Sequence, residues 1–317
     1  MKIIITGGSG FIGSNLTNFL IKQNHQIVLF VRNKNKLTNV TTNQNIFIEY
    51  VDVTNYSQLS KSLELHKPDI IFHLAGETSH QKSFENPMYD IDVNAKSTLC
   101  ILETLRKLDL KCRFILGSTF IVIGKPENLP INEITPCNPT TIYGVNRLAS
   151  EHYCKIFSNL YGIDTVIFRI TNSFGPLEQY LTPKKNAVNY LIYQAYKGNE
   201  ISIYNQGNFF RDLIFISDVV TALNQIMLNG KSGNLYWVAS GTKTWFYEIG
   251  KWLHELTNVK VNYIDSPSYT SKVDVGNFLV DNSRLKSLGW TSLISPKMEL
   301  YLQLIILKRI LYKIIIN

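Results

Sequence analysis

Two side chains with complementary chemistry, Tyr143 and Arg147, lie four residues apart. Residues at this spacing share one face of a helix, so the guanidinium would stand beside the phenol. A neighbouring cation favours the phenolate, which lets a tyrosine exchange a proton with a hydroxyl or carbonyl oxygen near neutral pH. The pair therefore predicts acid–base catalysis. The alternative interpretation is an exposed tyrosine and arginine on a solvated helix face.

Three glycines, Gly7, Gly10 and Gly13, follow an apolar run over residues 2–6 and open a helical pattern over residues 11–20. A strand, a glycine turn and a helix bring backbone N–H groups and a helix amino end close to a phosphate. Glycine is common in any tight turn, but this context predicts a dinucleotide site. Its residues would be Gly7, Gly10, Phe11, Ile12 and Gly13.

The residues that select between NAD(H) and NADP(H) directly follow the second apolar run, residues 26–31. An acid there would accept hydrogen bonds from the adenosine ribose, whereas an arginine accommodates a 2′-phosphate. The chain has Arg32 and no acid at this point. We therefore expect NADP(H), with NAD(H) as the alternative if Arg32 is a solvated loop residue.

Seven short apolar runs are typical of buried strands, and helical patterns separate the first six. The runs cover residues 2–6, 26–31, 46–51, 69–75, 113–118, 166–170 and 236–239. This alternation predicts an α/β fold with a doubly wound parallel (Rossmann) sheet. We expect a dinucleotide-binding domain over residues 1–171, with later contributions around 211–240. A smaller C-terminal substrate lobe would occupy most of residues 172–317.

Composition narrows the function classes. Of 317 residues 45% are hydrophobic and 18% charged, which are globular values. The net charge of +8 comes from scattered lysines, so we expect an anionic small substrate and no nucleic acid. The four cysteines have no metal-ligand spacing, so no metal site is expected, and the absence of a leader pattern predicts a cytoplasmic enzyme.

The apolar stretch 298–316 is interrupted by Lys308, Arg309 and Lys313, so it is poorly suited to span a membrane. It predicts either a terminal helix packed on the lobe or on a partner subunit, or a peripheral contact with anionic lipid.

Several segments together resemble the extended short-chain dehydrogenases/reductases, and specifically the NAD-dependent epimerase/dehydratase family of nucleotide-sugar enzymes. They are the glycine turn at 7–13, HLAG at 73–76, YGVNR at 143–147, NSFGP at 172–176, RDLIFISDV at 211–219, and the D-x-S and LGW segments at 281–283 and 288–290. The resemblance implies a nucleotide-diphosphate sugar as substrate and a homodimer formed through helices near Cys100 and His152.

The resemblance also implies roles for individual residues. Thr119 would hydrogen-bond the sugar oxygen on which Tyr143 acts, and Arg147 stands where the family has a lysine that holds the nicotinamide ribose. Arginine keeps the charge but is planar and bulkier. The cofactor edge would include Asp52, Val53, Leu74, Ala75 and Gly76, and the substrate diphosphate would contact Asn172 and Arg211. His73 is expected to be a packed strand residue.

One departure narrows the reaction. The 4,6-dehydratases of this family carry an Asp-Glu pair after the threonine, whereas this chain has Phe120 and Ile121. Dehydration is therefore not expected. Arg32 favours an NADPH-dependent 4-ketoreductase acting on a nucleotide-linked deoxysugar for bacterial surface polysaccharides, of the dideoxyhexose-synthase type. The alternatives are a UDP-hexose 4-epimerase with tightly bound NAD and a non-catalytic NAD(P)-binding sensor. The sensor is favoured by Arg147 and by Ile123, which stands where the family's V-Y-G segment has tyrosine.

Overall fold

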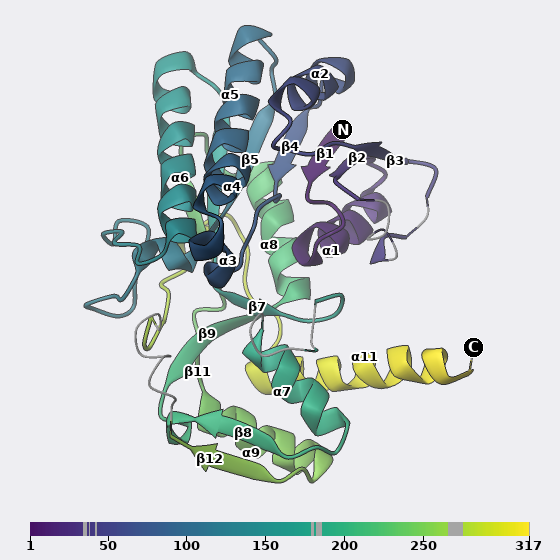
Figure 1. Ribbon diagram of the computed structural model, residues 1–317, viewed down its shortest axis with the longest axis vertical. Helices are drawn as coiled ribbons and strands as arrows, with labels where there is room; N and C mark the ends of the chain where they lie inside the picture. Colours follow the sequence, from purple (N-terminus) through teal and green to yellow (C-terminus); the bar gives the residue numbers. More distant parts are fainter. Residues whose placement is uncertain are drawn as a thin grey trace.

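A seven-stranded parallel sheet forms the larger half of the molecule (Figure 1). The computed structural model describes residues 1–33, 37, 39–41, 43–178, 181, 186–265 and 275–316, with side chains up to residue 308. The strand order is β10-β6-β5-β4-β1-β2-β3. The strands β1 and β4 are neighbours in the middle of the sheet; β2 and β3 lie outside β1, and β5, β6 and β10 lie outside β4. The strands are β1 Lys2–Thr6, β2 Gln26–Val31, β3 Ile46–Tyr50, β4 Ile70–His73, β5 Arg113–Thr119, β6 Thr165–Ile170 and β10 Leu235–Val238.

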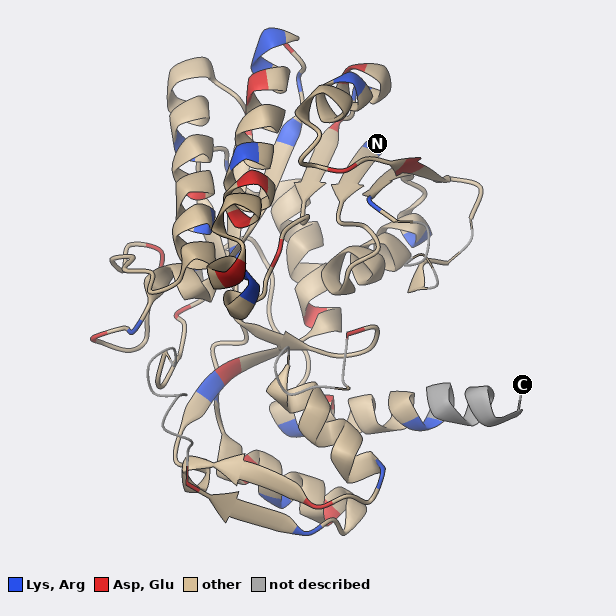
Figure 2. Cartoon of the chain, viewed as in Figure 1, with Lys and Arg blue, Asp and Glu red and all other residues tan. Residues whose placement is uncertain are grey.

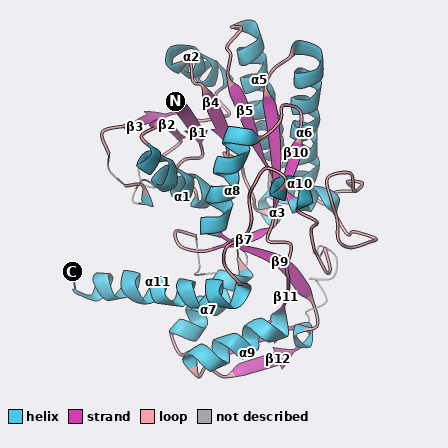
Figure 3. Ribbon diagram, turned by 180° about the vertical axis from the view of Figure 1, so that it is seen from behind, coloured by secondary structure: helices cyan, strands magenta, loops and turns pink. Residues whose placement is uncertain are grey.

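This arrangement confirms the predicted doubly wound sheet, and each predicted strand boundary lies within two residues of the observed one. The central strands are rich in valine and isoleucine because helices cover both faces of a parallel sheet. On one face α1 (Phe11–Leu20) packs against α8 (Ile216–Asn229), which is seen in front of the sheet in Figure 3. The other face is covered by α2 (Tyr56–His66), α5 (Ser97–Lys107) and α6 (Ile142–Tyr161).

Short helical segments connect β4 to α5. They are α3 (His80–Glu85), α4 (Pro87–Ile91) and a π-helical turn, η3 (Asp92–Lys96), which runs directly into α5. The 3-10 segments are η1 (Ile21–Gln23), η4 (Phe120–Ile123) and η5 (Asn205–Gly207). A π-turn within a helix is often found at a functional site, and this one faces α6.

The smaller half lies beyond the carboxyl ends of the strands (Figure 1). Its first sheet has the order β11-β9-β7, and its second pairs β12 with β8. The strands are β7 Asn172–Phe174, β8 Ile201–Tyr204, β9 Phe210–Phe215, β11 Lys243–Trp245 and β12 Val261–Ile264. Its helices are α7 Ala187–Tyr196, α9 Phe246–Thr257 and α11 Pro296–Ile316, while α10 Ser283–Lys286 packs beside β10.

Charged residues of both signs are spread over the described helices and loops (Figure 2). The terminal helix α11 begins against α7 and α9 and then extends sideways from the smaller half (Figure 1). Its first turns bury Leu300, Leu304 and Leu307. No helix in the described part of the chain combines the length and the apolar character that crossing a bilayer requires.

Candidate active site

The amino end of α6 positions Tyr143 and Arg147. Thr141 caps the helix by accepting a hydrogen bond from the Gly144 N–H at 3.0 Å. Tyr143 is 6% exposed and Arg147 is 3% exposed, and the guanidinium carbon lies 5.9 Å from the centre of the phenol ring. Both side chains are therefore interior, which contradicts the alternative of a solvated helix face.

Arg147 is a buried cation whose donors are mostly unused. Its Nη2 donates to the carbonyl oxygen of Ala75 at 3.2 Å. Its Nε and Nη1 are buried and have no hydrogen-bond partner among the described residues. Because leaving such donors unpaired is costly, a bound ligand with oxygen acceptors is the natural partner for them. A ribose diol fits this donor set.

Thr119 ends β5 at the carboxyl edge of the sheet, where ligands bind in open α/β folds. Its Oγ1 accepts a hydrogen bond from the Ile121 N–H at 3.3 Å and so begins η4. This turn contacts the start of α6, because a Cβ added at Gly144 would lie 3.2 Å from the Ile121 carbonyl oxygen. The fold thus brings Thr119 and Tyr143 to the same edge of the sheet.

The two residues after Thr119 are apolar and packed. Ile121 is 8% exposed and belongs to the core beneath α6. The ring of Phe120 packs edge-on against Phe278 with centroids 5.0 Å apart. No carboxyl group is available at either position for a second proton transfer.

The glycine turn has the close backbone contacts that a dinucleotide site requires. Gly7 has φ +69°, and a Cβ there would lie 2.9 Å from the Ala75 nitrogen. A Cβ at Gly13 would lie 2.4 Å from the Gly7 carbonyl oxygen. The helix α1 begins at Phe11 and Ile12 with no side chain capping its N–H groups. The uncapped end suits a pyrophosphate.

His73 links the turn to the helices instead of acting as a base. Ser97 Oγ donates to the Val93 carbonyl oxygen, so it accepts from His73 Nε2 at 3.1 Å. His73 Nδ1 is then the acceptor for the Thr6 hydroxyl at 2.8 Å. Burial, helped by the charge of Arg147, lowers the pKa of His73 to about 3. The histidine is a neutral, packed strand residue, as predicted.

The other residues expected at the cofactor edge follow β4, β3 and β2. Leu74 and Ala75 follow β4, and the Thr6 hydroxyl accepts the Ala75 N–H at 3.1 Å. Asp52 lies after β3, where its Oδ1 accepts hydrogen bonds from Thr54, and Val53 is buried beside it. Arg32 lies after β2 and its Nη1 donates to the Tyr89 hydroxyl of α4.

Asn172 and Arg211 lie on neighbouring strands of the small sheet. Asn172 pairs with Leu213 in the parallel register of β7 and β9, and Arg211 is two residues before Leu213. Both side chains therefore belong to the same face of the sheet. Arg211 donates to the Phe210 carbonyl oxygen at 3.1 Å and lies over the Phe209 ring. The geometry is compatible with two groups contacting one elongated ligand.

Asp212, next to Arg211, is a buried junction that the sequence analysis did not identify. Its carboxylate accepts hydrogen bonds from the N–H groups of Ser240, Gly241 and Val280 and from the Ser240 hydroxyl. Burial raises its pKa to about 7, against the opposing effect of these donors. The aspartate ties β9 to the end of β10 and to residue 280.

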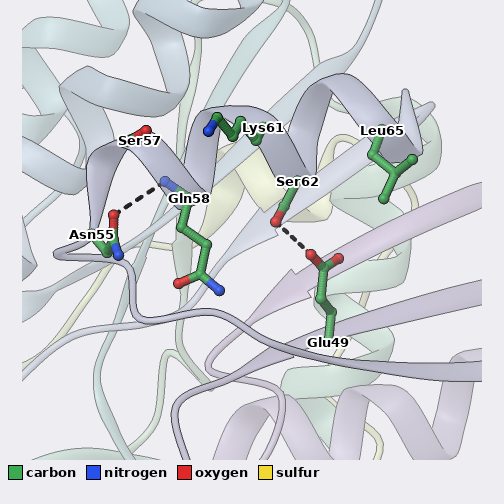
Figure 4. A pocket seen from close by; sticks show the side chains of 7 residues that line it. All are labelled: Glu49, Asn55, Ser57, Gln58, Lys61, Ser62 and Leu65. Atoms are coloured by element: carbon green, nitrogen blue, oxygen red, sulfur yellow. Dashed lines mark hydrogen bonds between the residues drawn. The ribbon is translucent and has the colours of Figure 1, made fainter.

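A pocket of about 540 Å³ lies elsewhere, on the outer side of α2 against the edge strand β3 (Figure 4). Within it, Ser62 donates to Glu49, and Asn55 caps α2. A second pocket, of about 630 Å³, lies between α9 and β12. Neither contains a predicted site residue, and the polar groups named in the first pocket already have protein partners.

The chain is similar to known proteins along most of its length. The model of the NAD dependent epimerase/dehydratase family matches residues 3–239. A relative from Methanocaldococcus jannaschii, provisionally named a UDP-glucose 4-epimerase, is 30% identical over 292 residues, which are 91% of this chain and 92% of the relative. A dTDP-glucose 4,6-dehydratase from Salmonella typhimurium is 30% identical over 260 residues, covering 74% of this chain and 71% of the relative.

The fold is also similar to solved structures. The UDP-glucose 4-epimerase of Thermotoga maritima, solved with UDP-glucose, superposes with a TM-score of 0.88 at 26% identity, and the match covers 98% of this chain and 100% of that one.

Proposed function

Because this chain belongs to the NAD-dependent epimerase/dehydratase family, we propose that it is a nucleotide-sugar 4-epimerase. The observation that favours it over a dehydratase is the pair Phe120 and Ile121, packed where a dehydratase of this family would need carboxyl groups. A site with Tyr143 as its proton-transfer group is suited to oxidation and reduction at one carbon. The relatives named as 4-epimerases support the same choice.

The proposed mechanism assigns one task to each residue. A nicotinamide cofactor supplies hydride transfer at the sugar carbon. Tyr143 takes the proton from the sugar hydroxyl and later returns it, while Thr119 holds the same oxygen by a hydrogen bond. Arg147 would hold the nicotinamide ribose through Nε and Nη1, the donors that have no partner among the described residues. Asn172 and Arg211 bind the diphosphate, for which the arginine fork is well suited.

A second candidate is the NADPH-dependent 4-ketoreductase acting on a nucleotide-linked deoxysugar for polysaccharide precursors. Arg32 favours it, because this arginine follows β2 with no acidic neighbour there. The two candidates differ in how the cofactor is used. An epimerase regenerates its cofactor in each cycle, whereas a reductase consumes NADPH.

The test combines cofactor analysis with turnover. Nucleotide released from the purified protein by heat is identified by chromatography, and UDP-glucose, UDP-galactose and their N-acetyl forms are incubated with and without added NAD⁺. Interconversion of a sugar pair without net NAD(P)H change supports the epimerase. NADPH oxidation with a 4-keto nucleotide sugar, and no interconversion, overturns it in favour of the reductase. Binding of NAD(P)(H) without any turnover would indicate a sensor.

Two partner assignments belong to the same proposal. We infer a homodimer through α5 and α6, because Ile156 and Leu160 on α6 are 47% and 71% exposed. The burial of Leu300, Leu304 and Leu307 supports a terminal helix that packs on its own lobe, with lipid contact as the alternative. Light scattering after gel filtration tests the first inference. Flotation with anionic liposomes, comparing the intact chain with one truncated at Leu300, tests the second.

A further inference from the structure

Gly76 lies against the guanidinium of Arg147. A Cβ built on Gly76 would be 2.1 Å from Arg147 Nη2, 3.1 Å from its Cζ and 2.7 Å from Asn94 Oδ1. The backbone of Gly76 does not have the positive φ that favours glycine. Glycine is therefore required here for space and not for conformation.

The space beside Gly76 fixes where the cation lies. Nη2 occupies it and donates to the Ala75 carbonyl oxygen at 3.2 Å. Asn94, in the π-helical turn η3, closes the other side, and its amide donates to the Glu77 carbonyl oxygen at 3.1 Å. Asn94 Oδ1 is buried with no partner among the described residues. The guanidinium therefore lies between the segment after β4 and the π-turn.

We propose that Gly76 is the positioning residue that lets an arginine serve as the site's cation, so that positions 76 and 147 form one unit. The atoms that a Cβ would meet are the ends of two side chains, so the backbone has no need to move. The guanidinium would shift instead, and Nε and Nη1 would shift with it. A displacement of about 1 Å in such a group can cost about a hundredfold in rate.

Lysine at position 147 would respond differently. Its ammonium is a compact charge on a flexible stem and has no second branch to fill the space beside Gly76. An alanine at 76 should then be tolerated. The proposal rests on the proposed role of Arg147 toward the nicotinamide ribose, and it predicts that the effect of a methyl group at 76 depends on the residue at 147.

The experiment compares wild type, Gly76→Ala, Arg147→Lys and the double variant. A matched control is Gly250→Ala in α9, where a Cβ would also meet only side-chain ends, Ile203 Cδ1 at 2.6 Å and Tyr263 Oη at 2.7 Å. The readouts are the Kd for NAD(H) and NADP(H) by titration of the nucleotide-free protein, kcat and KM for the converted sugar, and Tm.

We expect Gly76→Ala to weaken nucleotide binding and lower kcat by about ten- to a hundredfold, with a Tm change no larger than that of Gly250→Ala. Adding Gly76→Ala to Arg147→Lys should change both readouts less than about threefold, a coupling that a merely structural glycine would not show. Equal losses in both backgrounds, or no loss beside Arg147, would overturn the proposal. So would an absence of nucleotide binding in all four proteins. If nucleotides bind but no sugar turns over, the 4-epimerase assignment fails while the binding comparison still decides the coupling.

Discussion

Arg169 and Glu151 form a buried two-point ion pair, with Nη2 2.7 Å from Oε2 and Nε 2.9 Å from Oε1. Ser118 donates to the same carboxylate at 2.5 Å. The pair thus joins α6 to β6 and to the residue that precedes Thr119. Its two side chains are 2% and 0% exposed, so neither charge can be compensated by water.

Replacing Glu151 by Gln should leave the Arg169 charge buried without a counterion. We expect the free energy of unfolding to fall by about 3–5 kcal/mol, measured by urea denaturation. The matched control is Glu103→Gln, which removes an acid from the surface pair with Arg106 and should have little effect. Equal losses of unfolding free energy in the two variants would show that the buried pair contributes no more to stability than the surface pair.

Replacing Tyr143 by Phe removes the proposed proton-transfer group and keeps the ring that packs against His80. We expect kcat to fall by about 10²–10⁴, while nucleotide binding and Tm stay near wild type. Tyr153→Phe, which changes a partly buried tyrosine on the same helix, is the control. A Tyr143→Phe enzyme that converts its substrate at the parental rate would exclude this tyrosine as the acid–base group.

Arg32 tests the choice of cofactor. If its guanidinium binds a 2′-phosphate, Arg32→Ala should lose about tenfold or more in NADP(H) affinity, about 1.4 kcal/mol, with little change for NAD(H). Tyr89→Phe keeps the guanidinium and removes its partner hydroxyl, so its effect should be smaller. Isothermal titration gives both affinities. Unchanged NADP(H) affinity in Arg32→Ala would mean that the arginine makes only the surface contact with Tyr89.

Glu299 gives the stability an unusual pH dependence. Burial, with added repulsion from Asp218 and Asp212, raises its pKa from 4.5 to about 8, although the Phe215 N–H opposes the shift. Between these values the unfolded chain loses the proton first, so stability falls as pH rises, by up to roughly 1.4 kcal/mol per pH unit. Glu299→Gln should remove this loss. The variant should match wild type near pH 4 and exceed it at pH 9.

Urea denaturation at several pH values measures this difference. Glu255→Gln is the control of opposite sign, since the hydrogen bond from Lys297 lowers the pKa of Glu255. That substitution should remove a small stabilisation that is present above the normal glutamate pKa. A Glu299→Gln variant that gains nothing at pH 9 would contradict the assigned burial effect.

The central sheet could be predicted because the residue patterns that mark its strands are contiguous in the sequence. Most of its strands are short, mainly apolar runs, of which β1 is rich in isoleucine, and the glycine turn gives the first strand and helix a fixed relation. The strands β7, β8, β9, β11 and β12 were not predicted as a set. Four of them have only three or four residues. Their partners, and those of the longer, buried β9, lie far along the chain, as with Asn172 and Leu213.

The site was predictable at the level of residue types but not of contacts. Tyr143 and Arg147 stand out by their spacing, yet the contact of Arg147 with Gly76 joins residues far apart in sequence. Glu151 follows Arg147 by four residues and so lies on the same face of α6. That spacing was a usable signal for the buried pair, but its partner Arg169 belongs to another strand. Such pairs depend on the packed fold and not on local pattern.

The junction at Asp212 has a consequence for substrate choice. Its carboxylate fastens the backbone beside Arg211 to the end of β10. Arg211, the proposed diphosphate-binding residue, is therefore held in place relative to the large sheet, on which α6 with Tyr143 packs. The distance between Arg211 and Tyr143 would then be fixed and would select substrates by length. We expect nucleotide sugars, whose diphosphate can contact Arg211 while the sugar lies at Tyr143, to bind, and simple sugar 1-phosphates to bind weakly.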